Sequence, residues 1–359
     1  MLFPYKYIPH SIEKMQKFVD YIFDEVWCKA QSVPDYSFNL YDNEPELKDV
    51  IISFDSSNNK SSIFFNTKIR EIFDVFKRLP ATDIKKLKSW YKANNEIEKL
   101  CSNDPDVTPV LYKELKNFNL RLSDLIETFF KNLYPNKDHN ILSPPPLSRK
   151  IGKIIDHYTE FMNVNKKGKC PFCGINDIKG NNHTKRDAYD HYLPKKLYPF
   201  NSINFRNLAP MCNDCNSFYK SAKDPLHSTN DNRRKAFYSY SSACYKVEIR
   251  ISLTSTDIEH LTSDDITIKF GPPDLLEELN TWNELFEIEK RYKDKCCSAD
   301  ARYWISQVIE EGENCGLMPI KMLSAKFKCA ENSPYSDTNF LRIPFLKACK
   351  EKNIFKDTL

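Results

Sequence analysis

Apolar residues recur every three to four positions from the N-terminus to about residue 135, which is the spacing of one face of an α-helix. Four segments carry such a stripe: one that Ser11 can cap, residues 61–79, one after Thr82, and one opened by Thr108-Pro109. A polar residue ahead of a stripe is a common helix start, and proline is tolerated at the first helical position. Residues 1–147 are therefore predicted to form a helical domain.

A proline-rich segment follows this domain. Residues 134–147 contain Pro135 and three consecutive prolines at 144–146. Proline cannot continue a helix because it lacks the amide hydrogen and clashes with the preceding turn. We interpret the segment as a linker, and the stripe from Ile151 to Phe161 predicts one more helix after it.

The last third of the chain has a mixed pattern. Residues 245–253 and 265–270 alternate between apolar and polar positions, as strands do, while residues 275–286, 303–309 and 320–327 have helical spacing. The predicted fold class is thus α+β. We expect a helical N-terminal domain over 1–147, a central module over 148–232, and a mixed, mostly helical C-terminal region over 233–359.

The N-terminus lacks the apolar segment of a secretory signal, and no stretch approaches the roughly 20 apolar residues of a membrane span. The expected location is cytoplasmic, with no membrane contact. Disulfides are rare in the cytoplasm, so the twelve cysteines need another explanation. Eight show no pattern, and we predict that they are small buried apolar residues: Cys28, Cys101, Cys244, Cys296, Cys297, Cys315, Cys329 and Cys349.

The positive charge of the chain is concentrated in one segment. The net charge is +4, but residues 166–223 contain nine Lys and two Arg against four Asp, which gives 11 − 4 = +7 and leaves 4 − 7 = −3 elsewhere. A local phosphate-binding surface needs such a concentration. A solvated lysine-rich face would have the same composition.

The remaining four cysteines form two CxxC pairs, Cys170/Cys173 and Cys212/Cys215, which are separated by 38 residues. Each pair can place two thiolates on one metal, and two pairs complete a tetrahedral zinc site. Gly174 suits the tight turn that this arrangement requires. A site closed by four cysteines has no position for water, so the predicted zinc is structural.

Three short motifs lie between and just after these pairs. Asp190-His191 is followed by Pro194, Asn207 precedes a leucine, and Asn216 comes directly after the second pair. This order resembles the HNH endonuclease family over about 50 residues of the chain. The resemblance implies the ββα-metal fold of that family in the central module.

The resemblance also implies a role for each residue. His191 would be the general base that takes a proton from the attacking water, and Asn207 would orient His191. Asp190 and Asn216 would hold one Mg²⁺ or Mn²⁺ through oxygen atoms. The third letter of the family name is thus an asparagine here.

Four basic residues near these motifs are expected to contact the phosphates of the substrate: Lys195, Lys220, Lys185 and Arg186. Lys195 stands where many family members have a small hydroxyl residue. The loop at 196–200 lacks the usual pair of glycines, which leaves its path open.

Other polar and aromatic residues of the segment have simpler interpretations. His183 is expected on the surface, and Asp187 ranks below Asp190 as a metal ligand. Tyr192 and Phe205 can stack on bases, but we expect them in the core beside the cysteines. His157 lies on a predicted helix and is interpreted as structural.

The predicted function is hydrolysis of DNA phosphodiester bonds. The layout resembles HNH effector nucleases of bacterial anti-phage systems, such as those of Septu and of some retrons, which act beside an ABC-type ATPase. The sequence contains no Gly-x-x-x-x-Gly-Lys motif, so such an ATPase would be a separate partner chain.

Two alternatives stay open at this point. The first is a non-catalytic, zinc-binding adaptor for nucleic acid or protein. The second is a ribonuclease toxin with the same centre, although RNA is the less favoured substrate.

Overall fold

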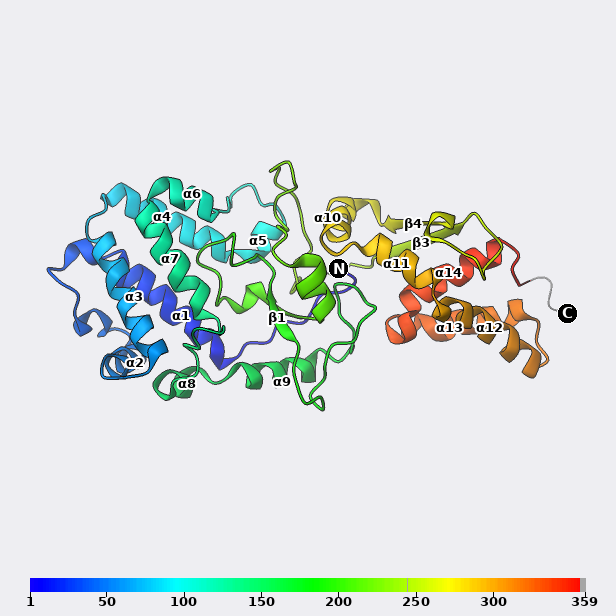
Figure 1. The fold of residues 1–359 in the computed structure, drawn as a ribbon, viewed down its shortest axis with the longest axis horizontal. Coiled ribbons are helices and arrows are strands. Elements are labelled where there is room, and N and C mark those ends of the chain that lie inside the picture. The colour runs from blue at the N-terminus through cyan, green and yellow to red at the C-terminus, as the bar shows by residue number, and fades with distance from the viewer. Residues whose placement is uncertain (244, 356–359) are drawn as a thin grey trace.

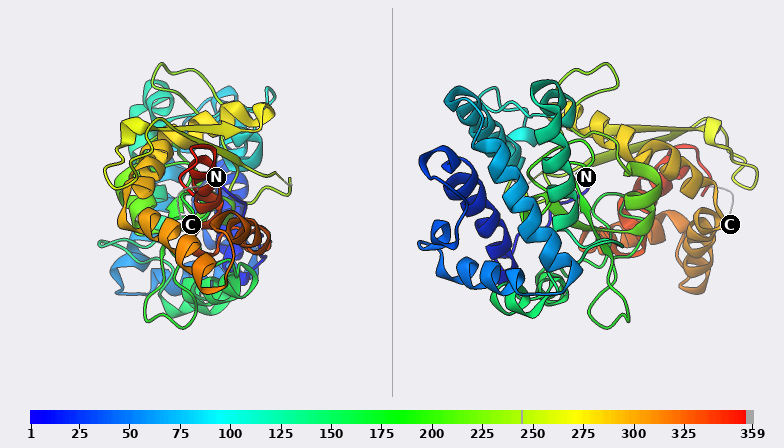
Figure 2. Two further views of the ribbon diagram at one scale, coloured as in Figure 1. Left: turned by 90° about the vertical axis from the view of Figure 1, so that its right-hand side faces the viewer. Right: turned by 60° about the vertical axis from the view of Figure 1, so that its left-hand side comes forward.

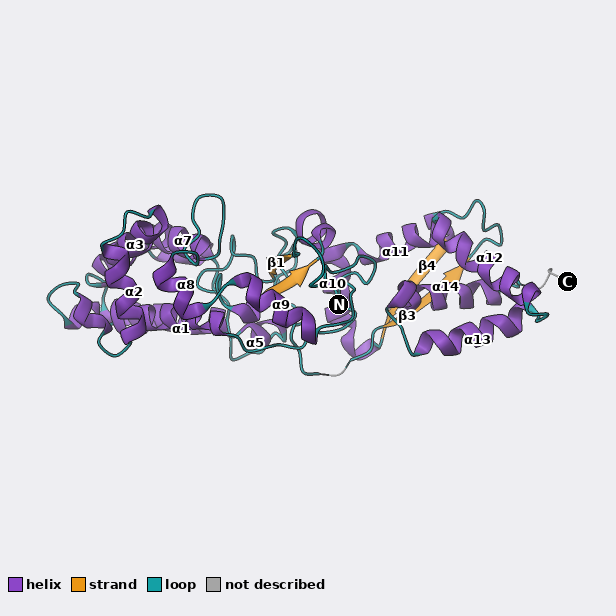
Figure 3. Cartoon of the chain, turned by 90° about the horizontal axis from the view of Figure 1, so that it is seen from below, coloured by secondary structure: helices purple, strands orange, loops and turns teal. Residues whose placement is uncertain are grey.

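The computed structural model describes residues 1–243 and 245–355. The molecule is elongated, with the N-terminal helices at one end, strand β1 (Ala188–His191) near the middle and helices α12–α14 (residues 299–351) at the other end (Figure 1). Helices predominate, and the strands form two separate pairs (Figure 3). The predicted α+β class is confirmed.

The N-terminal part is helical, as predicted, and Figure 2 shows its helices running side by side. Its elements are η1 (Ser11–Glu13), α1 (Lys14–Tyr21), η2 (Ile22–Trp27), η3 (Ala30–Ser32), η4 (Phe38–Tyr41), α2 (Pro45–Asp55), α3 (Lys60–Phe76), α4 (Ala81–Asn95), α5 (Ile97–Cys101), α6 (Tyr112–Phe118) and α7 (Leu120–Leu133). Aromatic side chains fill its centre: the fully buried Trp27 ring lies 5.4 Å from that of Phe129 and 6.0 Å from that of Phe76. The predicted stripes thus form a core.

Two of the predicted helix starts are wrong. His10, not Ser11, caps the first helix, because its Nδ1 accepts from the Ile12 amide at 3.1 Å while the Ser11 hydroxyl donates elsewhere. The helix expected from Thr108-Pro109 begins only at Tyr112. The Val110 amide donates to the Asn94 side chain of α4 at 2.9 Å instead, and Leu111 is extended.

The proline-rich segment is not an open linker. Two of its prolines start a helix, α8 (Pro145–Ile151). Amides in the first turn of a helix have no hydrogen-bond partner within the helix, so a residue without an amide hydrogen is tolerated there. Ile141 and Leu142 are buried, so the segment is packed against the core. Helix α9 (Ile154–Val164) follows, as predicted.

The two strand pairs differ in their surroundings. β1 (Ala188–His191) and β2 (Leu208–Met211) pair antiparallel in the middle of the molecule, with η5 (Phe205–Asn207) just before β2. The predicted strands of the last third form the second pair, β3 (Glu248–Leu253) and β4 (Ile266–Gly271). Helix α14 packs on β3.

Helices make up the rest of the C-terminal region. They are η7 (Ser263–Asp265), η8 (Pro273–Leu275), α10 (Leu276–Phe286), α11 (Ile288–Cys297), α12 (Ala299–Asn314), α13 (Pro319–Glu331), η9 (Ser336–Thr338) and α14 (Asn339–Glu351). The predicted mixture of one strand pair and helices is confirmed. Within the described residues, no helix combines the length and apolarity that crossing a membrane requires.

The prediction that the unpatterned cysteines are buried holds for only some of them. Cys101, Cys296 and Cys349 are buried, Cys28 and Cys297 are half-buried, and Cys315 and Cys329 are exposed. Cys244 lies outside the described residues. The two exposed thiols lie at the end of α12 and near the end of α13, away from the buried core.

Candidate functional site

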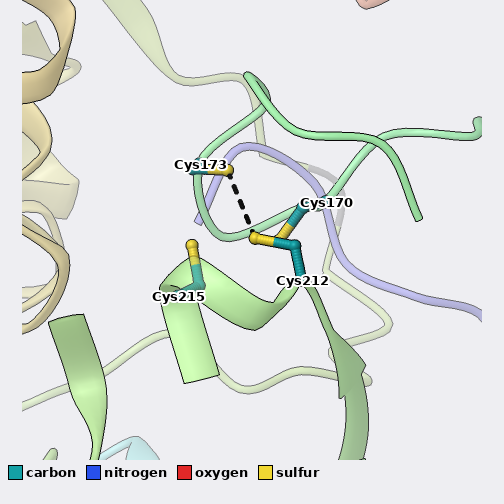
Figure 4. Close-up of side chains that lie close together, drawn as sticks. All are labelled: Cys170, Cys173, Cys212 and Cys215. Atoms are coloured by element: carbon teal, nitrogen blue, oxygen red, sulfur yellow. Dashed lines mark hydrogen bonds between the residues drawn. The ribbon is translucent and has the colours of Figure 1, made fainter. Parts of the chain in front are cut away.

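The four patterned cysteines converge on one buried point (Figure 4). Their Sγ atoms all lie within 4.8 Å of one another, and those of Cys173 and Cys212 are 3.9 Å apart. A disulfide would need about 2 Å. A tetrahedral zinc with bonds of about 2.3 Å separates its sulfurs by about 3.8 Å. The cluster therefore fits a structural zinc, as predicted.

The first pair lies on a tight turn that only glycine can complete. The Gly174 amide donates to the Cys170 carbonyl at 2.6 Å, and Gly174 has a left-handed φ of 70°. A Cβ at this position would lie 2.3 Å from a methyl group of Leu2. Backbone conformation and close packing thus both select glycine here.

The second pair joins β2 to a short helix. Cys212 follows β2, and Cys215 lies in η6 (Asp214–Lys220), a helix of π type in which the Ser221 amide bonds to the Asn216 carbonyl at 3.0 Å. In β1, Asp190 lies opposite Ala209. The chain therefore runs through two antiparallel strands and one helix, and the zinc cluster joins the helix to the loop before β1.

His191, at the end of β1, is held by the backbone of the following loop. Its Nε2 lies 2.9 Å from the Ser202 carbonyl oxygen. A carbonyl can only accept, so Nε2 carries the proton and Nδ1 keeps its lone pair. Burial, with a smaller effect of Lys195, lowers the pKa of His191 to about 3. The imidazole is therefore neutral at physiological pH, and it also packs edge-on against Tyr134.

Asn207 acts on the backbone rather than on the imidazole. Its fully buried side chain accepts from the Leu193 amide at 2.7 Å and donates to the Leu193 carbonyl at 3.0 Å. Its own carbonyl accepts from the Tyr192 amide at 2.9 Å. Asn207 thus fixes the chain directly after His191, while the Ser202 carbonyl makes the contact with the ring that was expected of Asn207.

Asp190 is buried and lies beside a buried lysine. The Lys220 amine is 2.8 Å from Asp190 Oδ2 and 3.0 Å from the His191 carbonyl, and its side chain is fully buried. Burial raises the pKa of Asp190 above its usual value, and Lys220 opposes this effect. The amine and Oδ2 thus form a buried ion pair. Carboxylate oxygens are suitable ligands for a hard cation.

Asn216 lies on η6 four residues before Lys220, close to one turn of this wide helix, so the two share a face. Its side chain is half-buried. An amide oxygen is a suitable ligand for the same hard cation. The structure thus brings Lys220 directly onto Asp190, with Asn216 on the neighbouring helix.

The other predicted phosphate contacts lie at different depths. Lys195 is half-buried: its amine donates to the Lys131 carbonyl at 3.2 Å and lies 5.7 Å from the centre of the Tyr134 ring. Burial, and then Lys131, lower the pKa of Lys195. Arg186 is half-buried against the Tyr189 ring, and Lys185 is exposed. Lys220 was expected to contact phosphate, which requires an exposed side chain. Its side chain is instead buried beside Asp190.

The simpler interpretations agree with the structure. Tyr192 and Phe205 are buried in the core, and His183 is exposed. Asp187 accepts from the Lys179 amide at 2.7 Å and so has a structural role. His157 is buried on α9 with its Nδ1 against the Tyr189 hydroxyl.

Sequence reasoning missed two contributors to this site. The Ser202 carbonyl is a backbone atom, which no side-chain pattern can reveal. Arg291, on α11, donates to Cys215 Sγ at 3.3 Å from 76 positions further along the chain. Arg291 lies in a stretch rich in charged residues, and no local pattern there indicates a contact with the cysteines.

Comparison with known proteins gives one partial similarity. A 104-residue stretch is 31% identical to the Septu protein PtuB of Bacillus thuringiensis. The stretch covers 27% of this chain and 38% of that protein, so the match spans little more than a third of the relative. No family model matches the chain, and no solved structure matches it. Part of the chain is therefore similar to a Septu protein.

Proposed function

We propose that this protein is a metal-dependent endonuclease of the HNH type that hydrolyses DNA in bacterial anti-phage defence. The observation that carries the proposal is the state of His191. Its Nε2 is committed to a backbone carbonyl, its Nδ1 keeps a lone pair, and a buried carboxylate precedes it in the chain. The similarity to a Septu protein supports the defence role.

In the proposed reaction, His191 Nδ1 accepts a proton from a water molecule whose oxygen attacks the phosphorus. The bond from phosphorus to the 3′ oxygen then breaks, and that oxygen takes up a proton from solvent. The Ser202 carbonyl keeps the ring oriented and would strengthen its bond to Nε2 as positive charge develops on the imidazole. Arg186, which lies over the Tyr189 ring, and Lys195, which lies over the Tyr134 ring, would lie near the phosphate backbone.

Asp190 and Asn216 would hold Mg²⁺ or Mn²⁺, whose bound charge stabilises the phosphate as it becomes more negative. Lys220, 2.8 Å away, favours the ionised form of Asp190 against the effect of burial. The cysteine cluster would hold zinc and take no part in the chemistry, because its four thiolates leave no open position.

The partner is the second part of the proposal. Septu-like effectors act beside an ABC-type ATPase, and we propose that such an ATPase is the protein partner of this chain. Target choice would then come from the partner and from the regions outside the 170–220 segment. Non-catalytic zinc binding and RNA cleavage are the competing functions.

The test uses the zinc-loaded full chain, alone and with a candidate ABC-type ATPase from the same genome. Plasmid, single-stranded DNA and transfer RNA are offered with Mg²⁺ or Mn²⁺. We expect DNA cleavage that His191→Ala reduces by at least about 100-fold, the usual size of a general-base effect. His183→Ala is the matched control, since His183 is an exposed histidine of the same segment.

Each alternative predicts a different result. Preferential cleavage of transfer RNA would replace the DNA proposal with the ribonuclease. Nucleic-acid binding without cleavage by the wild-type protein, even beside its partner, would favour the zinc adaptor. Equal activity of His191→Ala and His183→Ala would remove His191 from the mechanism.

A further inference from the structure

The C-terminal region holds the zinc knuckles through three side chains of α10 and α11. The Trp282 indole donates to the Phe172 carbonyl at 2.6 Å, and the Tyr292 hydroxyl donates to the Cys173 carbonyl at 2.9 Å. Arg291 makes the third contact, from Nη1 to Cys215 Sγ at 3.3 Å. The first two bonds hold the loop of the first cysteine pair, and the third holds the helix of the second pair.

Arg291 contacts helix η6 at two points. Besides its bond to Cys215, its guanidinium carbon lies 4.1 Å from the centre of the Tyr219 ring. The same Nη1 lies 3.4 Å from the Phe286 carbonyl, at the end of α10. A planar guanidinium can stack on a ring and donate in its own plane at the same time, which an ammonium group cannot do. Arg291 therefore ties η6 to the junction of α10 and α11.

Helix η6 connects this contact to the candidate nuclease site. Lys220 follows Tyr219 directly, and its buried amine lies 2.8 Å from the Asp190 carboxylate. Both contacts lie within the seven residues of η6. Cys215 and Tyr219 contact Arg291, and Lys220 contacts Asp190. A shift of η6 at Cys215 would move the amine away from the carboxylate.

Charge gives Arg291 a second role. Four thiolates around one Zn²⁺ leave a net charge of −2 in a buried cluster, and hydrogen bonds from a cation to a thiolate are stronger than neutral ones. Arg291 is the one cation that the hydrogen bonds of the described residues place on a cysteine of the cluster.

We propose that Arg291 is a positioning residue that stabilises the zinc thiolate of Cys215 and fixes η6, so that Lys220 stays on Asp190. The zinc part stands independently of the nuclease. The part that concerns Asp190 rests on the proposed function, because it assigns a purpose to that position.

The first experiment measures the zinc centre of the full chain. Arg291→Gln, Arg291→Lys and the control Lys290→Gln, whose side chain is 80% exposed on the same helix, are compared with the wild type. Outer partners of a metal site are worth about 10–100-fold in metal affinity. We expect the zinc affinity of Arg291→Gln, measured by competition with a chelator, to fall by that factor. The affinity of Arg291→Lys should fall by less, and that of Lys290→Gln should match the wild type.

A spectroscopic signature separates this role from a merely structural one. With Co²⁺ in place of zinc, the hydrogen bond to Cys215 lowers the energy of the sulfur lone pair, so its loss should shift the thiolate-to-metal charge-transfer band to longer wavelength. Arg291→Gln should show the shift, and Lys290→Gln should not. Unchanged spectra and chelator rates in Arg291→Gln would overturn the proposal.

Hydrogen exchange then tests the position of η6. In zinc-saturated Arg291→Gln, the amides of residues 214–221 should exchange faster, while those of β3 and β4 keep their wild-type rates. Unchanged exchange at 214–221 would overturn the positioning role. None of these measurements requires cleavage, so a failure of the nuclease proposal leaves their outcome readable. If Arg291→Gln does not fold, Arg291→Lys decides by the same three measurements.

Discussion

At the scale of single residues, the site depends on backbone groups that side chains hold in place. His191 meets a carbonyl, and Asn207 meets both polar groups of the Leu193 backbone. A side chain that pairs with a buried backbone donor and a buried acceptor cannot be shortened without leaving both unsatisfied. Asn207 should therefore affect stability as well as the orientation of the loop after His191.

We expect Asn207→Ala to lower the free energy of unfolding by about 2–4 kcal/mol, because two buried backbone groups lose their partner. Urea denaturation of the zinc-loaded protein measures the difference. Asn182→Ala is the control, since Asn182 is an exposed amide in the same module, and it should change stability by less than about 0.5 kcal/mol. Equal stability of the two variants would contradict the role assigned to Asn207.

His157 should make stability depend on pH. Burial, and then the charge of His10, lower the pKa of His157 to about 4 from the usual 6.5. The unfolded chain therefore binds the proton more readily, so the contribution of His157 is fully present above pH 6.5 and is lost as the pH falls toward 4. By pH 5 the loss should reach about 2 kcal/mol.

The measurement compares the wild type with His157→Phe, which cannot titrate, in urea at pH 7.5, 6 and 5. Protonation of the zinc thiolates affects both proteins and cancels in the difference. The advantage of the wild type over the variant should shrink by about 2 kcal/mol between pH 7.5 and 5. A constant difference would show that His157 does not titrate between these limits.

At the scale of elements, β1 and η6 meet through one buried ion pair. Lys220 is fully buried and Asp190 nearly so. Removing one member of a buried pair leaves an uncompensated charge, which costs about 3–5 kcal/mol, whereas removing both costs much less. The pair should therefore behave as a unit that joins strand to helix.

A double-mutant cycle tests this coupling. Lys220→Met should destabilise the zinc-loaded protein by about 3–5 kcal/mol, and adding Asp190→Asn should recover at least about 2 kcal/mol of that loss. Lys113→Met is the control, because Lys113 pairs at 2.8 Å with Asp231, their side chains are 54% and 70% exposed, and exposed pairs contribute about 1 kcal/mol or less. Additive effects of the two buried substitutions would rule out the coupling.

The elements that could be predicted from sequence are those whose local pattern agrees with their environment. The stripes of α3 and α4 and the alternation of β3 and β4 were sufficient. The start of α6 was not, because Asn94 of α4 accepts the Val110 amide at 2.9 Å and so keeps residues 108–111 out of the helix. That bond joins positions 16 apart, and no local rule includes it.

The candidate site divides in the same way. The cysteine spacing alone predicted the zinc cluster, since ligand type and geometry are fixed by the metal. The burial of Lys220 and the contact of Arg291 with Cys215 depend on how distant helices pack. A lysine in sequence looks the same whether it meets a phosphate or a buried carboxylate.

At the scale of the whole molecule, the N-terminal helices hold the loop that orients His191. Asn94 of α4 donates to the Pro199 carbonyl at 3.0 Å, and the Ser202 hydroxyl donates to the Phe130 carbonyl of α7. Phe200 lies between them with a left-handed φ of 79° and a fully buried ring. A non-glycine residue keeps such a conformation only where its surroundings enforce it, so the helical domain determines the path of this loop.

Asn94→Ala should therefore loosen residues 199–204 from a distance. The substitution removes the bonds of Asn94 to Val110 and Pro199, and the amides of 199–204 should then exchange at least about tenfold faster, which corresponds to about 1.4 kcal/mol. The cysteine cluster does not contact Asn94, so zinc content should stay at the wild-type level. Lys92→Ala, an exposed position on the same helix, is the control.

If the nuclease proposal is correct, Asn94→Ala should also slow cleavage, because the Ser202 carbonyl would no longer hold His191 Nε2 in a fixed position. The expected loss is in the maximal rate, with little change in DNA affinity, since no phosphate-facing side chain is altered. Faster exchange at 199–204 with an undiminished rate would mean that His191 keeps its orientation without this carbonyl. Slower cleavage with unchanged exchange would mean that α4 acts on the site by a route other than this loop.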